Sequence, residues 1–166
     1  ANDSLVYFIS TFFPTNFNIE AIVMKNNSGK GLSIQKSNLN LTGGDFEDNR
    51  YLMYFLDISS CNSIQIFNCL FSFAENTEKN KATLISIASS TGFLQNISIN
   101  AEYSTACLKL YYSNFNINSS NFIKCLTGLY AEKSILNFTS SQLRENSALI
   151  GAGLSLLNSQ LFCLNL

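Results

Sequence analysis

The sequence predicts an all-β protein, a parallel β-helix solenoid of about seven coils with about three short strands per coil. A degenerate unit of roughly 21 to 28 residues recurs along the chain, as in other repeat proteins. Within each unit apolar and polar residues alternate, which is the pattern of a strand with one buried face. A single unit cannot bury this face alone, so we expect the units to stack in parallel around one shared core.

The clearest part of the repeat is Ser/Thr-x-φ-x-φ, where φ is an apolar residue. Clear copies begin at Thr15, Ser37, Ser113 and Ser134, and looser copies begin at Ser63, Thr91 and Ser159. Alternation places one set of residues inside the coil, namely Leu39, Leu41, Phe115, Ile117, Leu136 and Phe138. It places the residues between them outside, namely Asn40, Asn116 and Asn137.

Two further patterns complete the coil. About nine residues after each start comes φ-x-x-polar, beginning at Met24, Phe46, Phe73, Ile99, Phe122 and Leu143. An alternating apolar pair precedes several starts, as in Leu32/Ile34, Leu108/Leu110, Leu129/Ala131 and Leu154/Leu156. Each pattern predicts one short strand of the coil.

A helical solenoid and a β-sandwich are the competing folds. Some helical repeats have periods near this range. However, Ser, Asn, Thr, Phe and Ile are poor residues for helix surfaces, and the apolar residues alternate. The sandwich or another all-β fold remains the main alternative to the β-helix.

Residues 143–154 resemble the FxxN and GG[A/I/L] repeats of polymorphic outer-membrane-type proteins. Residues 46–49 and 73–76 match FxxN, and residues 29–34 are similar to residues 151–156. The resemblance implies a right-handed β-helix similar to the pectin lyase fold, on a surface protein. In such a phrase the Phe fills the core, and the Asn turns the chain and bonds a neighbouring Asn in a ladder.

Composition limits the possible partners. The length fits one domain, residues 1–166, and 46% hydrophobic residues supply a core. Charged residues make up only 13% of the chain and the net charge is −1, so we expect no nucleic-acid partner. No apolar run approaches 18 residues, so no membrane span is expected in this segment. We interpret the chain as a processed product, a fragment or a unit of a longer solenoid.

Asparagine sequons indicate a secreted or cell-surface protein. The N-x-[ST] motif occurs at Asn2, Asn26, Asn40, Asn96, Asn118 and Asn137. Asn40 and Asn137 occupy the same outward position of the repeat, where a glycan fits. We therefore predict N-linked glycans, above all at Asn40, Asn118 and Asn137, and an extracellular or cell-surface location.

The five cysteines do not follow metal-ligand spacing, and the chain has no histidine. Cys61, Cys69, Cys107 and Cys125 are the disulfide candidates, and Cys163 is left over. Pairing of Cys61 with Cys69 or of Cys107 with Cys125 would join residues near in sequence. The alternative is that most of them are small buried core residues.

Catalysis has little support in the sequence. Histidine, the commonest general base, is absent, and the chain lacks phosphate-loop and nucleophile-elbow motifs. The acidic cluster Asp45, Glu47 and Asp48, beside Arg50, is the candidate for calcium or carbohydrate chemistry. Two of its residues occupy the x positions of an FxxN phrase, so we expect a solvated turn and no cofactor.

Two functions from different classes follow. The first is a non-catalytic extracellular structural or adhesive module, a glycosylated rod of a coat, stalk or filament. It would contact copies of itself or neighbouring β-helix segments end to end. The alternative is a protein that binds or cleaves polysaccharide in a shallow groove, as a lyase or hydrolase does. Convergence of exposed acids and aromatic residues on one face would favour the alternative.

Overall fold

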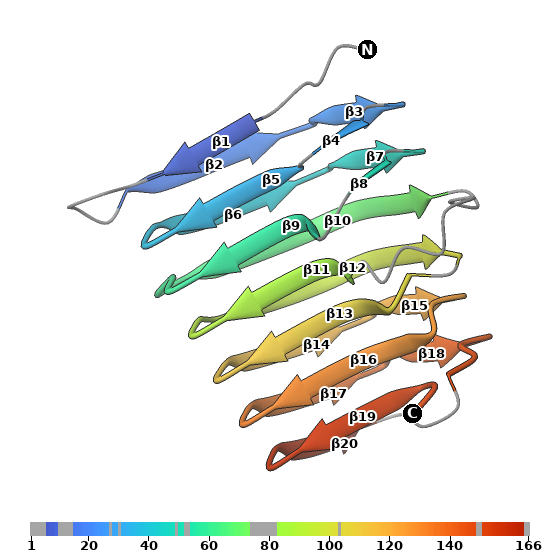
Figure 1. Cartoon of the computed structure of the whole chain (residues 1–166). Helices are drawn as coiled ribbons and strands as arrows, with labels where there is room; N and C mark the ends of the chain where they lie inside the picture. The colour runs from blue at the N-terminus through green and yellow to red at the C-terminus, as the bar shows by residue number, and fades with distance from the viewer. Residues whose placement is uncertain are drawn as a thin grey trace.

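The computed structural model describes residues 6–9, 15–26, 28–29, 31–48, 50–51, 54–73, 83–102, 104–148 and 151–164. These residues form parallel strands that wind around one axis as a β-solenoid (Figure 1). Every element in these ranges is a strand, so the predicted all-β class is confirmed. The same ranges contain no helix of the length and hydrophobicity that a membrane crossing needs.

The first sheet contains seven strands, one from each successive turn. In order they are β1 (Val6–Ile9), β5 (Leu32–Gln35), β9 (Tyr54–Ser59), β11 (Thr83–Ala88), β13 (Ala106–Tyr111), β16 (Thr127–Glu132) and β19 (Leu154–Leu157). Neighbours pair in parallel, and Leu108 lies opposite both Ile85 and Leu129. The alternating pairs predicted from the sequence therefore form ladders along the solenoid.

The second sheet follows the same order behind the first (Figure 1). Its main path is β2 (Asn16–Glu20), β6 (Asn38–Thr42), β10 (Ile64–Phe73), β12 (Thr91–Ala101), β14 (Asn114–Asn118), β17 (Ile135–Thr139) and β20 (Gln160–Leu164). Short strands extend it beside this path: β3 (Val23–Lys25), β7 (Asp45–Glu47), β15 (Asn121–Ile123) and β18 (Gln142–Arg144). A separate pair consists of β4 (Ser28–Gly29) and β8 (Arg50–Tyr51).

One hydrophobic core runs along the axis between the sheets. The residues predicted to face inward are all buried: Leu39, Leu41, Phe115, Ile117, Leu136 and Phe138. Asn116 and Asn137 are exposed and Asn40 is half-buried, as expected for the outer face. The ring of Phe46 stacks on that of Phe71 in the next turn, with centroids 4.7 Å apart. Full burial of such side chains stabilises each by about 1.5–3 kcal/mol.

The predicted number of about seven coils is corrected to five complete turns. The complete turns are those that begin with β5, β9, β11, β13 and β16, and each is described without a gap through the second sheet. The turn of β1 and β2 has an undescribed connection, and the described part of the turn of β19 and β20 lacks a third segment. In two turns the second and third strands are continuous, as β10 and β12.

Each turn changes direction at corners where one residue has a positive φ. The first corner, between the sheets, has Lys36, Ser60, Ser89, Tyr112, Lys133 and Asn158. The second corner, within the second sheet, has Ala21, Gly43, Asn68, Asn96, Ser119 and Ser140, and the third has Asn26, Asp48, Lys124 and Glu145. This conformation costs a non-glycine residue about 1 kcal/mol. The backbone N–H of the corner residue donates a hydrogen bond to a carbonyl of the next turn, which offsets this cost. Lys36 N–H, for example, lies 3.0 Å from the Ser59 carbonyl oxygen.

A serine ladder runs beneath the first corner. It is formed by the residue after each positive φ, namely Ser37, Cys61, Ser90, Ser113, Ser134 and Ser159. The Ser113 hydroxyl accepts a hydrogen bond from the Ser90 backbone N–H at 3.3 Å and donates one to the Tyr111 backbone carbonyl at 2.7 Å. The same two bonds recur at Ser90, Ser134 and Ser159. Buried backbone donors at the corner are thereby satisfied.

Three register assignments from the sequence were wrong by one or two residues. Phe71, rather than Phe73, lies opposite Phe46 and Ile99. Ser90, rather than Thr91, is the equivalent of Ser113, because Thr91 lies opposite Asn114. The start assigned to Ser63 is likewise displaced, because the ladder position belongs to Cys61 and Asn62 is an additional residue at that corner.

Candidate functional site

The acidic cluster predicted as the calcium candidate surrounds a lysine of the preceding turn. The Lys25 ammonium lies 3.0 Å from the Asp45 carboxylate and 2.5 Å from that of Glu47. Hydrogen bonds to Glu47 and then to Asp45 raise the pKa of Lys25 above its usual value. Asp48 is exposed at the third corner. Within the described ranges, no three His, Cys, Asp or Glu side chains come together as a metal site.

Aromatic side chains lie elsewhere on the surface. Tyr111 and Tyr130 are neighbours on the outer face of the first sheet, and the Lys109 ammonium lies about 5 Å from both ring centroids. On the second sheet Phe67 and Phe93 are paired, with centroids 5.7 Å apart. The acids of β7 and these aromatic residues thus occupy different parts of the surface.

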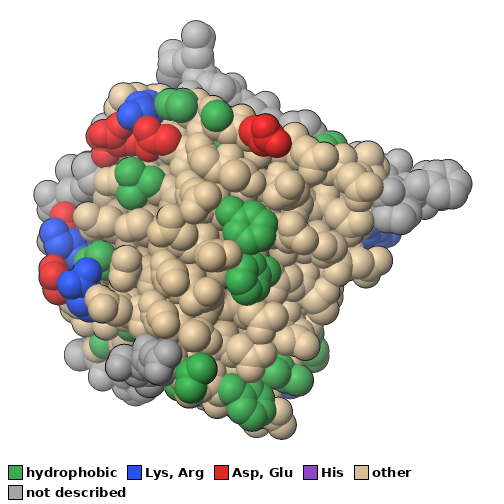
Figure 2. All heavy atoms as spheres, turned by 180° about the vertical axis from the view of Figure 1, so that it is seen from behind, with side chains coloured by type: hydrophobic (Ala, Val, Ile, Leu, Met, Phe, Trp, Pro, Cys, Tyr) green, Lys and Arg blue, Asp and Glu red, His purple; other side chains and the backbone are tan. Residues whose placement is uncertain are grey.

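The outer face of the second sheet is almost free of charge. Figure 2, turned by 180° from the view of Figure 1, looks onto this face. The main-path strands present mostly Asn, Ser, Thr and Gln there, together with the exposed apolar residues Leu70, Ile135, Phe162 and Leu164, and their one charged residue is Glu20. Charged side chains gather instead at one edge of the view. The face therefore offers hydrogen-bonding groups without an electrostatic field of one sign.

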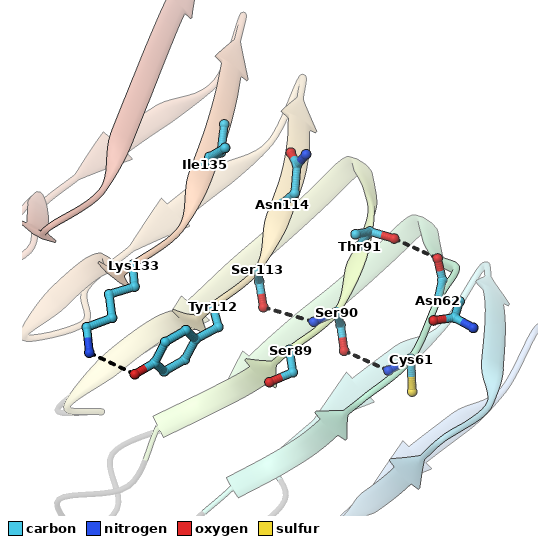
Figure 3. Close-up of a pocket in the computed structure, with 10 residues that line it drawn as sticks. All are labelled: Cys61, Asn62, Ser89, Ser90, Thr91, Tyr112, Ser113, Asn114, Lys133 and Ile135. Atoms are coloured by element: carbon cyan, nitrogen blue, oxygen red, sulfur yellow. Dashed lines mark hydrogen bonds between the residues drawn. The ribbon is translucent and has the colours of Figure 1, made fainter.

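A shallow groove follows the first corner (Figure 3). One hollow of about 360 Å³ is lined by Cys61, Asn62, Ser89, Ser90, Thr91, Tyr112, Ser113, Asn114, Lys133 and Ile135. A second, of about 300 Å³, is lined by Asn62, Ser63, Ile64, Gln65, Thr91, Gly92, Phe93, Asn114 and Asn116. The two share Asn62, Thr91 and Asn114, so we treat them as one site, the corner groove.

The serine ladder supplies the rigid base of the corner groove. Ser90 and Ser113 are buried and hydrogen-bonded between turns. Thr91, the residue after Ser90, donates a hydrogen bond from its hydroxyl to the Asn62 backbone carbonyl at 2.6 Å. The groove is therefore built on backbone that neighbouring turns hold in place, which favours a preformed site.

Tyr112 and Lys133 line the corner groove on the side of the first corner. Tyr112 is 58% exposed and has a positive φ, which turns its side chain out at the corner. The Lys133 ammonium lies 4.9 Å from the Tyr112 ring centroid and donates to its hydroxyl at 2.8 Å. That hydrogen bond is the main cause that raises the pKa of Lys133. The lysine therefore stays charged and holds the ring.

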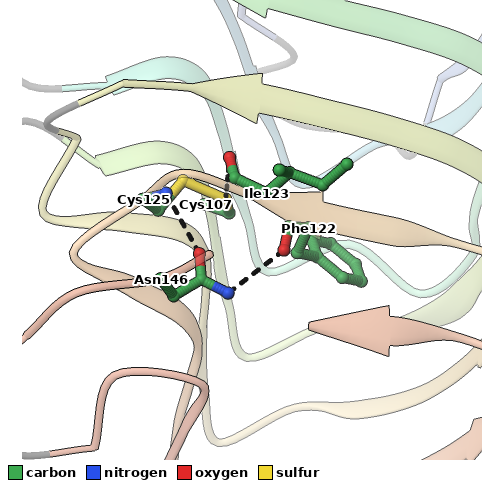
Figure 4. The surroundings of a disulfide bond; sticks show 5 residues. All are labelled: Cys107, Phe122, Ile123, Cys125 and Asn146. Carbon is green, nitrogen blue, oxygen red and sulfur yellow. Dashed lines mark hydrogen bonds between the residues drawn. A yellow bond between two sulfur atoms is a disulfide. The ribbon is translucent and has the colours of Figure 1, made fainter. Parts of the chain in front are cut away.

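The structure joins Cys107 to Cys125, with 5.6 Å between their Cα atoms (Figure 4). Asn146 of the next turn supports this corner, because its side-chain oxygen accepts from the Cys125 N–H at 3.0 Å and its amide donates to the Phe122 oxygen at 3.1 Å. Asn146 thus bonds the backbone rather than the neighbouring Asn expected for its motif. The bridge spans a sequence separation of 18, and such a loop stabilises a fold by about 3 kcal/mol.

The pairing of Cys61 with Cys69 is corrected, because both thiols are free and buried at different corners. Cys61 takes the place of a serine in the serine ladder of the first corner, and Cys69 takes the equivalent place at the second corner, where the Ser120 and Ser141 hydroxyls make the same two bonds. The Cys69 sulfur accepts a hydrogen bond from the Gly44 backbone N–H at 3.3 Å. The Cys61 thiol donates one to the Ser59 backbone carbonyl at 3.2 Å. Burial raises the pKa of both thiols, so they remain neutral. Cys163 is free and exposed.

Four of the six sequons lie on strands of the second sheet: Asn40, Asn96, Asn118 and Asn137. Asn26 is exposed at the third corner, and Asn2 lies outside the described residues. The Asn137 amide donates to Asn116 at 2.6 Å, and the Asn96 amide donates to Asn68 at 2.8 Å. Asn96 and Asn137 are exposed, so their modification stays a prediction that the geometry permits.

The sequence did not predict the corner groove. Its lining residues were part of the repeat, and their convergence depends on the bend between the sheets. A signal was nevertheless present, because aligning the ladder serines with Cys61 places Asn62, Thr91 and Asn114 in one row. Tyr112 was noted only as an aromatic residue near a strand end.

The fold defines the chain as a parallel β-solenoid. A scan against models of known protein families finds no match. A search of curated proteins finds none either. The function must therefore be argued from the surface of the solenoid itself.

Proposed function

We propose that this chain is a non-catalytic structural and adhesive module of an extracellular or cell-surface protein, which associates with further β-solenoid turns end to end. One observation carries the proposal. Inward residues that are buried elsewhere are open in the turn of β19 and β20. Ala131 is buried, whereas Leu156, which lies opposite it, is 40% exposed.

The open turn presents a continuation of both ladders. Leu161 lies opposite the buried Leu136, and the exposed Cys163 lies opposite the buried Phe138. A further turn stacked on these residues would remove apolar surface from water, at about 25 cal/mol per Å². It would also pair the strand edges of β19 and β20 in parallel.

The first and last described turns have both a first-sheet strand and a second-sheet strand. The first sheet begins and ends with four-residue strands, β1 and β19. The main path of the second sheet begins and ends with five-residue strands, β2 and β20. Stacking of the last turn of one copy on the first turn of another would be head-to-tail, a heterologous contact that extends into filaments when it does not close into a ring.

Separation of the acidic cluster of β7 from the corner groove supports a non-catalytic role. Asp45 and Glu47 hold Lys25 at the β3 and β7 edge, whereas Tyr112 and Phe93 line the corner groove. Cleavage of a glycan would require carboxylates beside the bound sugar. The right-handed coil and kinship with outer-membrane-type repeats, which residues 143–154 resemble, belong to this proposal as well.

Association in solution tests the stacking. We expect light scattering on the isolated chain, under reducing conditions, to show concentration-dependent association at micromolar protein. The double variant Leu156→Lys, Cys163→Lys places charges on the inward side of the open turn and should be monomeric. Its matched control, Leu157→Lys with Phe162→Lys, alters outward positions of the same strands and should still associate. A wild-type chain that stays monomeric would contradict stacking.

Mass spectrometry of native material tests the surface location. Glycosidase treatment should change the mass of peptides that contain Asn40, Asn118 and Asn137. Unmodified asparagine at all three positions would remove the argument for an extracellular site.

A further inference from the structure

We propose that the corner groove binds an uncharged polysaccharide chain that lies along the solenoid axis. This inference goes beyond end-to-end stacking, because it concerns a lateral surface in the middle of the molecule. The proposal requires the groove to bind the polysaccharide without cleaving it.

The direction of the groove follows from its lining. Asn62, Thr91 and Asn114 come from three successive turns, and Lys133 and Ile135 come from the next. Neighbouring strands lie about 4.8 Å apart, so this row extends for about 14 Å. An extended chain of a few sugar units fits such a row, whereas a compact metabolite would contact only part of it.

The side chains of the groove suit a neutral sugar. Amides of Asn62, Asn114 and Asn116 offer both donors and acceptors, as sugar hydroxyls require. The hydroxyl of Thr91 is in the row as well. Two aromatic rings flank this row on opposite sides, Tyr112 two residues before Asn114 and Phe93 two residues after Thr91, and provide apolar surfaces for the C–H faces of a sugar ring.

The charge of the groove disfavours an acidic polymer. Lys133 is the one lysine or arginine among the lining residues, and its ammonium is bonded to the Tyr112 hydroxyl. Binding of polyanions depends on several cations along the chain. The groove instead adjoins the nearly uncharged outer face of the second sheet, which matches a ligand without charge (Figure 2).

The position of two sequons determines how the protein should be produced for the test. Asn40 and Asn137 lie in the same outward ladder as Gln65, Phe93 and Asn116. Glycans at these positions would flank the groove. Material from a host that attaches no N-linked glycans therefore presents the groove to the probes without attached sugars beside it.

Calorimetric titration with hexasaccharides tests the inference. The probes are linear oligomers of β-1,4-glucose, β-1,3-glucose, N-acetylglucosamine and mannose, with polygalacturonate as the charged comparator. We expect at least one neutral oligomer to bind, and chromatography to recover it uncleaved. Failure of all four to bind, or binding of polygalacturonate alone, would overturn the proposal.

Substitutions locate the site. Tyr112→Ala and Phe93→Ala should each weaken binding about tenfold, as expected for loss of one aromatic platform. Tyr130→Ala removes an aromatic residue on the outer face of the first sheet and should leave binding unchanged. Equal loss in all three variants, with melting temperatures preserved, would show that the ligand does not occupy the corner groove.

The stacking proposal is tested separately from glycan binding. The variant Leu156→Lys, Cys163→Lys leaves every lining residue of the groove in place. It should bind the same oligomer with unchanged affinity even though it no longer associates. Loss of binding in this variant would mean that the ligand requires the assembled solenoid rather than the groove of one chain.

Discussion

The turn of β16 and β17 and the turn of β19 and β20 share an inward pattern but bury it to different extents. Leu136 is fully buried between two turns, whereas Leu161, opposite it, is only partly buried. Both positions follow a ladder serine, Ser134 or Ser159. Burial in a solenoid is therefore set by the presence of the next turn as much as by the residue itself.

The largest expected effect compares two leucines at one ladder position. Leu136→Ala should lower the free energy of unfolding by about 2–5 kcal/mol, because it leaves a cavity between turns. Leu161→Ala should cost less than about 1.5 kcal/mol in the monomer, because that side chain is already partly in water. Urea unfolding at low protein concentration measures both. A similar cost for the two variants would show that the last turn is covered in solution.

A smaller effect is expected in the serine ladder. Ser113→Ala leaves the buried Ser90 N–H without its acceptor, which costs about 1–3 kcal/mol. Ser159→Ala removes the same acceptor from Ser134, but water reaches this turn, so we expect a loss below about 1 kcal/mol. Thermal unfolding of the two variants gives the comparison. A larger loss at Ser159 would contradict the role of burial.

The smallest effect concerns a charge in the middle of the first sheet. Asp57 is half-buried on β9, and desolvation raises the pKa of its carboxyl above the usual 3.8. The folded state therefore binds this proton more tightly than the unfolded state, so stability falls as pH rises through the folded pKa. Asp57→Asn should raise the melting temperature slightly at pH 7 and leave it unchanged at pH 3. A gain that persists at pH 3 would point to a cause other than charge.

The alternation of apolar residues was sufficient to predict the strands and their inward faces. Leu39, Phe115 and Leu136 were placed correctly because a period of two allows only two faces. The register in the middle of the chain was less well predicted, because Asn62 adds a residue at one corner and Phe71 and Phe73 both face inward. Local pattern does not distinguish two inward positions of one strand.

The candidate site was harder to predict than the fold. Tyr112 and Lys133 meet because equivalent corners of adjacent turns lie side by side, although the residues are 21 apart in sequence. The choice between cysteine pairs also depended on the corners, since Cys61 and Cys69 replace serines at two different ones. Such juxtapositions follow from the stacking register, which individual motifs do not contain.

The serine ladder also gives the solenoid a direction. At each of its corners the backbone N–H belongs to the earlier turn and the accepting hydroxyl to the later one, from Cys61 with Ser90 to Ser134 with Ser159. During synthesis a turn therefore emerges before the group that completes its corner. When folding starts at the N-terminal turns, each new turn completes the corner of the turn before it and leaves its own corner N–H for the next turn to bond.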